Sequence, residues 1–207
     1  MVKLEVYIMG EQQLILTNKL LEEMKLQDYQ KDNTIYIDED ITSESVELWA
    51  RQLKNLGNKQ LSKSKEDKCP IKLIINCNGG SARDTFYFID LMEYYKKRGV
   101  EIYTYVTACA YSGAFKIGIS GSKRFGYKHS EFLCHQWNRF EYGTKTYQDT
   151  INEREHNDKL YNELAEIITS KTKITREMLD SYTKQNRDFI MDSKTALELS
   201  VIDEIIE

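Results

Sequence analysis

Short apolar runs alternate along this chain with segments whose apolar residues recur every three or four positions. The runs at 34–37, 71–75 and 101–106 predict strands, and the last two are rich in β-branched or aromatic residues. The segments at 46–56 and 85–97 have the spacing of helices that pack on one face. Because strand and helix alternate, we expect a layered α/β fold with right-handed crossovers.

The second half continues the alternation less regularly. We expect a helix over 114–120 and a short strand at 132–134. The segment 146–168 predicts a long helix that is too polar to be wholly buried, so it would project from the body or cover a neighbouring subunit. The tail, 188–206, predicts a short strand, a helix around Ala196 and a last strand.

Residues 1–33 carry two local patterns. Leu4 to Ile8 alternate between apolar and polar, which is typical of a strand. Leu20, Leu21 and Met24 have helical spacing.

Size and charge exclude several classes of protein. The chain has 207 residues, which fits one domain with a sizeable core. The net charge of −4, with both signs interspersed, gives no basic surface for nucleic acid or membrane. No apolar stretch approaches the roughly 20 residues of a membrane helix, and no signal peptide opens the sequence. The four cysteines lack a paired metal spacing, so we expect a cytoplasmic protein without metal or cofactor.

Three residues outside the periodic pattern could perform nucleophilic catalysis. Ser112 lies in a small-residue apolar segment, Cys109 to Phe115. A serine hydroxyl needs a base to remove its proton, and His135 follows an apolar run that could place it there. The base in turn needs an acid to orient it, and Asp188 precedes another apolar run.

Glycines beside two of the predicted strand ends could supply the remaining part of such a site. Acyl transfer needs two backbone N–H groups aimed at the developing oxyanion. Gly113 follows the serine directly, and Gly79 and Gly80 follow the strand 71–75. The sequence therefore predicts N–H donors from Gly80 and Gly113.

Each residue also has an ordinary structural interpretation. Ser112 alone could be a helix cap, and Asp188 alone a cap or turn residue. His135 alone could be a hydrogen-bonded core histidine, and Gly79-Gly80 alone a tight turn. The other histidines, His129 and His156, lie in polar surroundings and are expected to be solvated.

The order and context of these motifs resemble the ClpP family, the serine peptidase subunits of ATP-dependent proteases. The turn Asn76-Cys-Asn-Gly-Gly-Ser81 is similar to the family's Asn-Ser-Pro-Gly-Gly-Ser, with Asn78 in place of proline. Four further segments carry the rest of the resemblance to the family. They are Ala110-Tyr-Ser-Gly-Ala-Phe-Lys-Ile117, Gly121-Ser-Lys-Arg124, His135-Gln136 and Arg187-Asp-Phe-Ile-Met191. The resemblance covers 34–207, which we take as the ClpP-like serine peptidase domain, and leaves 1–33 as a divergent N-terminal segment.

The resemblance implies both a fold and an assembly. The fold would be the ClpP/crotonase type, with stacked βαβ units and the helix 146–168 as a projecting handle. The chain would be a homo-oligomer of heptameric rings, stacked as a tetradecamer around a chamber. A hexameric AAA+ unfoldase ATPase would deliver protein substrates, which Ser112, His135 and Asp188 would cleave.

Two registers of the serine motif stay open. Matching Gly113 to the family's glycine puts Tyr111 at the nucleophile position and gives an inactive ring subunit. In the other register, the segment Phe115-Lys-Ile117 and the turn Gly121-Ser-Lys-Arg124 are matched to the family's sequence without a gap. Ser112 is then the nucleophile, and this is the register we favour. Two other rivals are an acyl-CoA enzyme on the crotonase fold, hinted at only by Arg83-Asp84, and a signal peptide peptidase. The latter would use Lys116 or Lys123 as its base.

Overall fold

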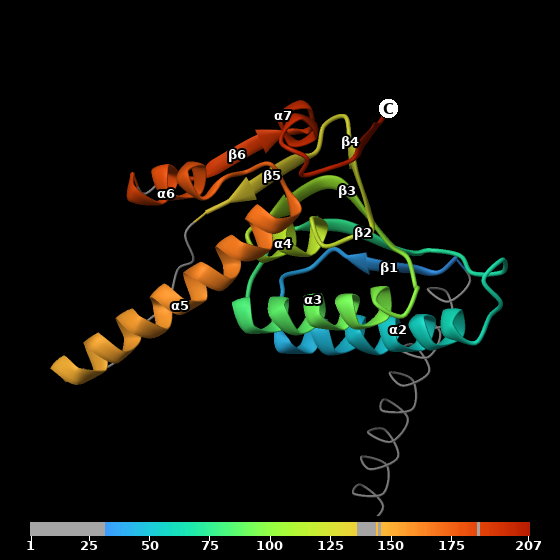
Figure 1. Ribbon diagram of the computed structural model, residues 1–207, viewed down its shortest axis with the longest axis horizontal. Coiled ribbons are helices and arrows are strands. Elements are labelled where there is room, and N and C mark those ends of the chain that lie inside the picture. Colours follow the sequence, from blue (N-terminus) through green and yellow to red (C-terminus); the bar gives the residue numbers. More distant parts are fainter. Residues whose placement is uncertain (1–31, 136–143, 145, 186) are drawn as a thin grey trace, which may run out of the picture.

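The computed structural model describes residues 32–135, 144, 146–185 and 187–207 (Figure 1). The two patterns noted near the N-terminus, Leu4 to Ile8 and Leu20 to Met24, lie outside the described residues. The predicted α/β class is confirmed, because a mostly parallel sheet alternates with helices. The elements are β1 (Thr34–Ile37), α2 (Ser43–Leu61), β2 (Ile71–Cys77), α3 (Ala82–Lys96), β3 (Ile102–Tyr111), α4 (Gly113–Gly118), β4 (Lys123–Tyr127), β5 (Glu131–Cys134), α5 (Tyr147–Lys171), α6 (Arg176–Lys184), β6 (Phe189–Asp192), α7 (Ser193–Glu198) and β7 (Glu204–Ile206).

The sheet divides along β3, and this division positions the candidate site. Strands β1, β2, β3, β4 and β7 form one parallel array in that order. The first part of β3, Tyr103 to Val106, pairs with β4. Its last part, Cys109 to Tyr111, pairs with β5 instead, and β6 adds to β5 in the antiparallel direction. The end of β3 is therefore flanked by the ends of β2 and β5.

Helices α2 and α3 lie side by side against one face of the sheet (Figure 1). Helix α2 begins at a capping box, in which the Thr42 and Ser45 side chains accept from each other's backbone N–H groups. Its apolar stripe buries Trp49 and Leu53 almost completely, and Trp49 meets the ring of Phe88 from α3 edge-on. This packing holds α2 against α3, the helix that follows the glycine turn.

Helix α5 leaves the body of the molecule along most of its length (Figure 1). Its buried residues, Leu164, Ala165 and Ile168, all lie in the C-terminal half. The other half is polar and exposed, apart from intermediate positions such as Ile151 and Leu160. The projecting helix expected at 146–168 is therefore present at 147–171.

Several element boundaries differ from those that the sequence predicted. Strand β3 runs to Tyr111 rather than ending at 106, because the small residues after Val106 continue the strand into its new pairing with β5. The predicted strand at 132–134 and the helix at 114–120 are present at 131–134 and 113–118. Strand β4 and helix α6 were not predicted. Strand β4 is short and partly exposed, and the residues of α6 are mostly polar.

Candidate active site

Ser112 occupies a sharp turn between β3 and α4. Its backbone has φ +53° and ψ −113°, which is a conformation that L-residues rarely adopt. The backbone is held on both sides, because the Ser112 N–H donates to Leu133 O at 2.9 Å and Lys116 Nζ donates to Ser112 O at 3.0 Å. Ser112 stands at the N-cap position of α4, but its hydroxyl makes no capping hydrogen bond to the helix.

The glycine turn after β2 lies directly against Ser112. A Cβ on Gly79 would be 2.8 Å from the Ser112 Cβ and 2.6 Å from Tyr111 O, so no side chain fits between the two turns. Gly80 has φ +147° and forms a bridge to Ile41, whose carbonyl would lie 2.3 Å from an added Cβ. The turn is thus locked between Ile41 and the serine segment.

The backbone nitrogens of Gly80 and Gly113 belong to the two turns that meet at this junction. Gly80 N is 3.7 Å from the point where a Cβ of Gly113 would stand. Within the described part of the chain, neither N–H donates a hydrogen bond to another group. Two unused donors at the mouth of a cleft are the arrangement that an oxyanion requires.

A cleft of about 460 Å³ brings most of the predicted site residues together. Ser112, Gly113, Gly80 and His135 all line it. His135 enters from the end of β5 and is half-buried, whereas His129 and His156 are exposed, as predicted.

Asp188 does not line the cleft and is exposed. Strands β5 and β6 pair Cys134 with Phe189, and continuing this antiparallel register places His135 opposite Asp188. No hydrogen bond joins Ser112, His135 and Asp188 among the described residues. Catalytic hydrogen bonds are often long until substrate or partner subunits tighten them.

Tyr111, the competitor for the nucleophile position, is occupied elsewhere. Its hydroxyl donates to the carboxylate of Glu131 on the neighbouring strand, and this hydrogen bond raises the Tyr111 pKa to about 12. Tyr111 does not line the cleft. Its phenol is therefore neither near the glycine turn nor easily deprotonated.

Lys116 is the residue of this region whose burial the sequence did not predict. Its side chain is 5 % exposed and lines the cleft on the side of α4 that faces α5. Burial lowers its pKa, since a desolvated ammonium is disfavoured. Its amine bonds the Ser112 carbonyl, and no hydrogen bond to the Ser112 hydroxyl is present. The position between Phe115 and Ile117 in an apolar segment was the one signal available for its burial.

Of the residues named for the two rival enzymes, Lys123 and Asp84 lie outside the cleft, whereas Lys116 lines it. Lys123 is exposed at the start of β4. The Asp84 carboxylate accepts from the Ser43 hydroxyl at 3.3 Å and lines a separate surface groove between α2 and α3. Neither residue supplies a base at the glycine turn.

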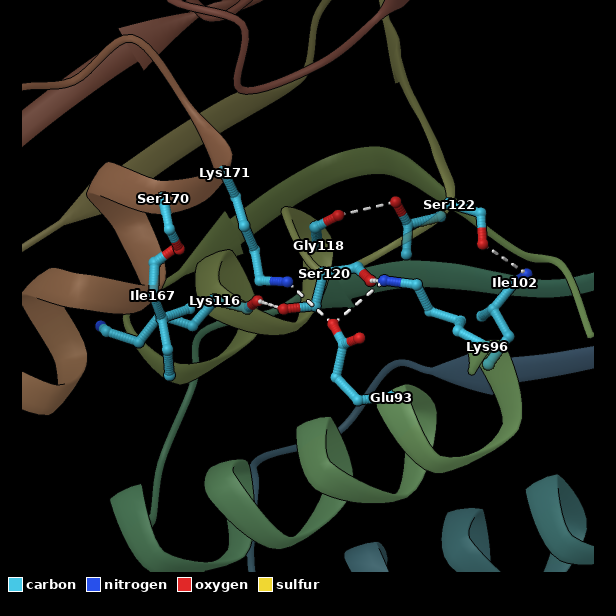
Figure 2. A network of polar contacts seen from close by, with 11 residues as sticks. Glu93, Lys96, Ile102, Lys116, Gly118, Ser120, Ser122, Ile167, Ser170 and Lys171 are labelled. Atoms are coloured by element: carbon cyan, nitrogen blue, oxygen red, sulfur yellow. Dashed lines mark hydrogen bonds and ion pairs between the residues drawn. The ribbon is translucent and has the colours of Figure 1, made fainter. Parts of the chain in front are cut away.

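A cluster of polar contacts braces the base of the site (Figure 2). Glu93 of α3 accepts from Lys96 at 3.0 Å and from Lys171, at the end of α5, at 2.8 Å. Lys96 also donates to Ser120 O at 2.8 Å, and the Ser120 hydroxyl donates to Lys116 O at 2.8 Å. Burial alone would raise the Glu93 pKa, but its two lysine partners lower it. The cluster therefore joins α3, α4 and the root of α5.

By its fold the protein is an α/β protein with a mostly parallel sheet. At the ends of its strands lie a serine with a strained backbone and an adjacent glycine turn. A family model described as Clp protease matches residues 21–207, so the chain belongs to the Clp protease family. Membership supports a ClpP-like peptidase and implies protein substrates and an oligomeric assembly. No helix in the described ranges is long and apolar enough to span a membrane. Nor do those residues contain a cluster of three or more His, Cys, Asp or Glu suited to a metal ion.

Proposed function

We propose that this protein is a serine endopeptidase, the proteolytic subunit of a Clp-like ATP-dependent protease in the cytoplasm. The observation that carries the proposal is the cleft, which Ser112 shares with His135 and with the two unused N–H groups of Gly80 and Gly113. This combination provides a nucleophile, a base and an oxyanion site at one point.

The reaction follows from these positions. The Ser112 hydroxyl attacks the scissile carbonyl carbon while His135 takes its proton, and the resulting oxyanion accepts hydrogen bonds from Gly80 and Gly113. His135 then gives that proton to the leaving amine, which departs and leaves an acyl group on Ser112. A water then attacks this ester while His135 takes its proton, and His135 passes that proton to the Ser112 oxygen as the ester bond breaks and the carboxylic acid product leaves.

Asp188 orients His135 in this scheme. It hydrogen-bonds the imidazole nitrogen that faces away from Ser112 and stabilises the imidazolium that forms. The ladder register between β5 and β6, continued by one residue, supports this pairing. We expect substrate binding or assembly into the oligomer to bring the Asp188 carboxylate and the His135 imidazole into hydrogen-bond contact.

The assembly proposed is a tetradecamer of two heptameric rings fed by a hexameric AAA+ unfoldase. Support comes from the family match and from the projecting helix α5, which offers a long exposed surface to another subunit. The chamber would exclude folded proteins, so the ATPase would unfold substrates before they reach Ser112.

Covalent labelling and mutation test the nucleophile directly. We expect a fluorophosphonate probe to modify Ser112 and no other serine, as mapped by peptide mass spectrometry. Ser112→Ala should abolish labelling and lower hydrolysis of a fluorogenic peptide by at least 10³-fold. The matched variant Tyr111→Phe should retain both. If labelling and turnover survive in Ser112→Ala or disappear in Tyr111→Phe, the proposed nucleophile is wrong.

A further inference from the structure

A second, smaller cavity, lined partly by α5, adjoins the cleft. The two share Lys116, His135 and Leu164 as common walls. The inner cavity measures about 30 Å³, and its remaining walls are mainly apolar side chains of α5, α6 and β6, among them Ile168, Leu179 and Phe189. A volume of this size holds about two waters, which is also the space that a carboxylate group fills.

Lys116 in the shared wall is a buried amine with no carboxylate partner among the described residues. No carboxylate of the described residues lies within ion-pair distance of its amine, whose single hydrogen bond is to the Ser112 carbonyl. Figure 2 shows its side chain leading away from Glu93, which already pairs with Lys96 and Lys171. An ammonium has three donors, so two remain unused here.

The other titratable groups named in the wall of the inner cavity supply no negative charge to pair with Lys116. The Cys134 thiol is buried, and burial raises its pKa, so it remains uncharged. The Tyr161 hydroxyl donates to Asp180 at 2.7 Å and is thereby engaged. Arg187 and His135 also line the cavity, and among the described residues no carboxylate does. An anion placed beside this amine favours its protonated form and pairs with it, so the cavity is suited to an anion.

We propose that the inner cavity receives the substrate side chain on the amino side of the scissile bond and that Lys116 makes it select aspartate or glutamate. The inference rests on the proposed function, because the cavity adjoins Ser112 and His135. The methylene stem of the substrate residue packs on Leu164 and Ile168, and its carboxylate accepts hydrogen bonds from Lys116. A charge-assisted bond in a dry site discriminates strongly against an uncharged analogue, which would leave the ammonium unpaired.

Three peptides that differ only in the residue before the scissile bond test this selectivity. With glutamate, glutamine or leucine at that position, we expect the wild-type kcat/KM to favour glutamate over glutamine by 10-fold or more. In Lys116→Met this ratio should fall to about 1, and the leucine peptide should be cleaved at least as well as before. The surface variant Lys97→Met should keep the wild-type ratio. A second variant, Lys116→Gln, serves if the methionine variant does not fold.

The outcomes separate selectivity from positioning. Loss of activity by the same factor on all three peptides in both Lys116 variants would mean that Lys116 only holds the Ser112 backbone, and would overturn the inference. So would a wild-type preference for leucine that is unchanged by Lys116→Met.

Binding tests the cavity even if the chain does not hydrolyse peptides. Ser112→Ala should bind a fluorescent peptide ending in glutamate at least 10-fold more tightly than its glutamine counterpart, as measured by anisotropy. That difference should vanish when Lys116→Met is added. Equal affinities in Ser112→Ala would reject the anion pocket, whereas absence of turnover and of fluorophosphonate labelling in the wild type would reject the proposed function alone.

Discussion

Ser112 adopts its unusual backbone conformation because its neighbours leave no alternative. The Leu133 carbonyl, the Lys116 amine and the glycine turn all contact this one residue. Conformations of this kind cost about 1–3 kcal/mol and persist where the surroundings over-determine them, commonly at active sites. The strain therefore supports a functional interpretation of the serine and can be measured independently of activity.

Replacing Ser112 by glycine should relieve the strain that alanine retains. We expect Ser112→Gly to be more stable than Ser112→Ala by about 1 kcal/mol, with both variants inactive, because glycine adopts φ +53° without a Cβ penalty. Thermal and urea unfolding measure the difference. Ser62, with φ −79° and ψ −8°, is the control, since glycine should there be less stable than alanine by about 0.5–1 kcal/mol. The same order at both sites would contradict the strain at Ser112.

A side chain at Gly80 should damage both the fold and the oxyanion site. An added Cβ would lie 2.3 Å from the Ile41 carbonyl, and neither backbone can move without breaking the Ile41 bridge. We expect Gly80→Ala to lose about 2–4 kcal/mol of stability and nearly all peptide hydrolysis. Gly118→Ala is the matched variant, since its Cβ would meet only side-chain carbons at 3.8 Å or more. Circular dichroism melts and peptide hydrolysis should show Gly118→Ala within about 1 kcal/mol of wild type.

At the scale of elements, one arginine ties β4 to the start of β7 and to the end of α5. Arg124 bonds Asp203 through its Nη2 at 2.5 Å and its Nε at 3.1 Å, and its Nη1 donates to Lys171 O at 2.7 Å. Burial alone would raise the Asp203 pKa, but the hydrogen bonds and charge of Arg124 lower it below its ordinary value. Through these bonds Arg124 couples the C-terminal end of α5 to the sheet.

The lowered Asp203 pKa predicts a specific pH dependence of stability. A carboxylate whose pKa is lower when folded stabilises the protein above its unfolded pKa of about 3.9, and this stabilisation is lost as the pH falls through the folded pKa. Asp203→Asn should cost about 1 kcal/mol at pH 7, allowing for solvent screening of this partly exposed pair, and little in strong acid. Unfolding midpoints of both proteins between pH 7 and pH 2 test this. A difference that grows as the pH falls would contradict it.

Local patterns predicted the elements better than their ends. The apolar spacing in α2 and α3 and the β-branched run in β2 predicted real elements, because each buries one face in the core. The length of β3 could not be predicted, since its last residues become a strand only by pairing with β5, a contact distant in sequence.

The candidate site was predictable in composition but not in geometry. Ser112, His135 and the two glycines converge on one cleft because the carboxyl ends of β2, β3 and β5 lie together, as parallel strands require. Two features depend on tertiary packing alone, namely the exposed position of Asp188 and the burial of Lys116 against α5. No sequence pattern distinguishes a buried lysine in a short apolar helix from one that reaches solvent.

At the scale of the whole molecule, α5 contributes both to the candidate site and to a surface remote from it. Its C-terminal half covers the inner cavity with Leu164 and Ile168. Its N-terminal half extends away from the body (Figure 1), where Tyr147 is 82 % exposed and Ile151 lies one turn further on the same face. We therefore expect this face of the helix to contact another subunit of the oligomer.

A charge placed on that face should therefore separate subunits without unfolding them. We expect Ile151→Asp to shift the assembly towards smaller species in light scattering and native mass spectrometry, while circular dichroism still shows a folded protein, because Ile151 belongs to no core cluster of its own protomer. His156→Asp, on a different face of the same helix, should leave the assembly intact. If both variants assemble like wild type, the N-terminal half of α5 is not a subunit contact. If Ile151→Asp dissociates and also loses peptide hydrolysis, the alignment of His135 with Asp188 depends on assembly, since the substituted residue lies outside both cavities.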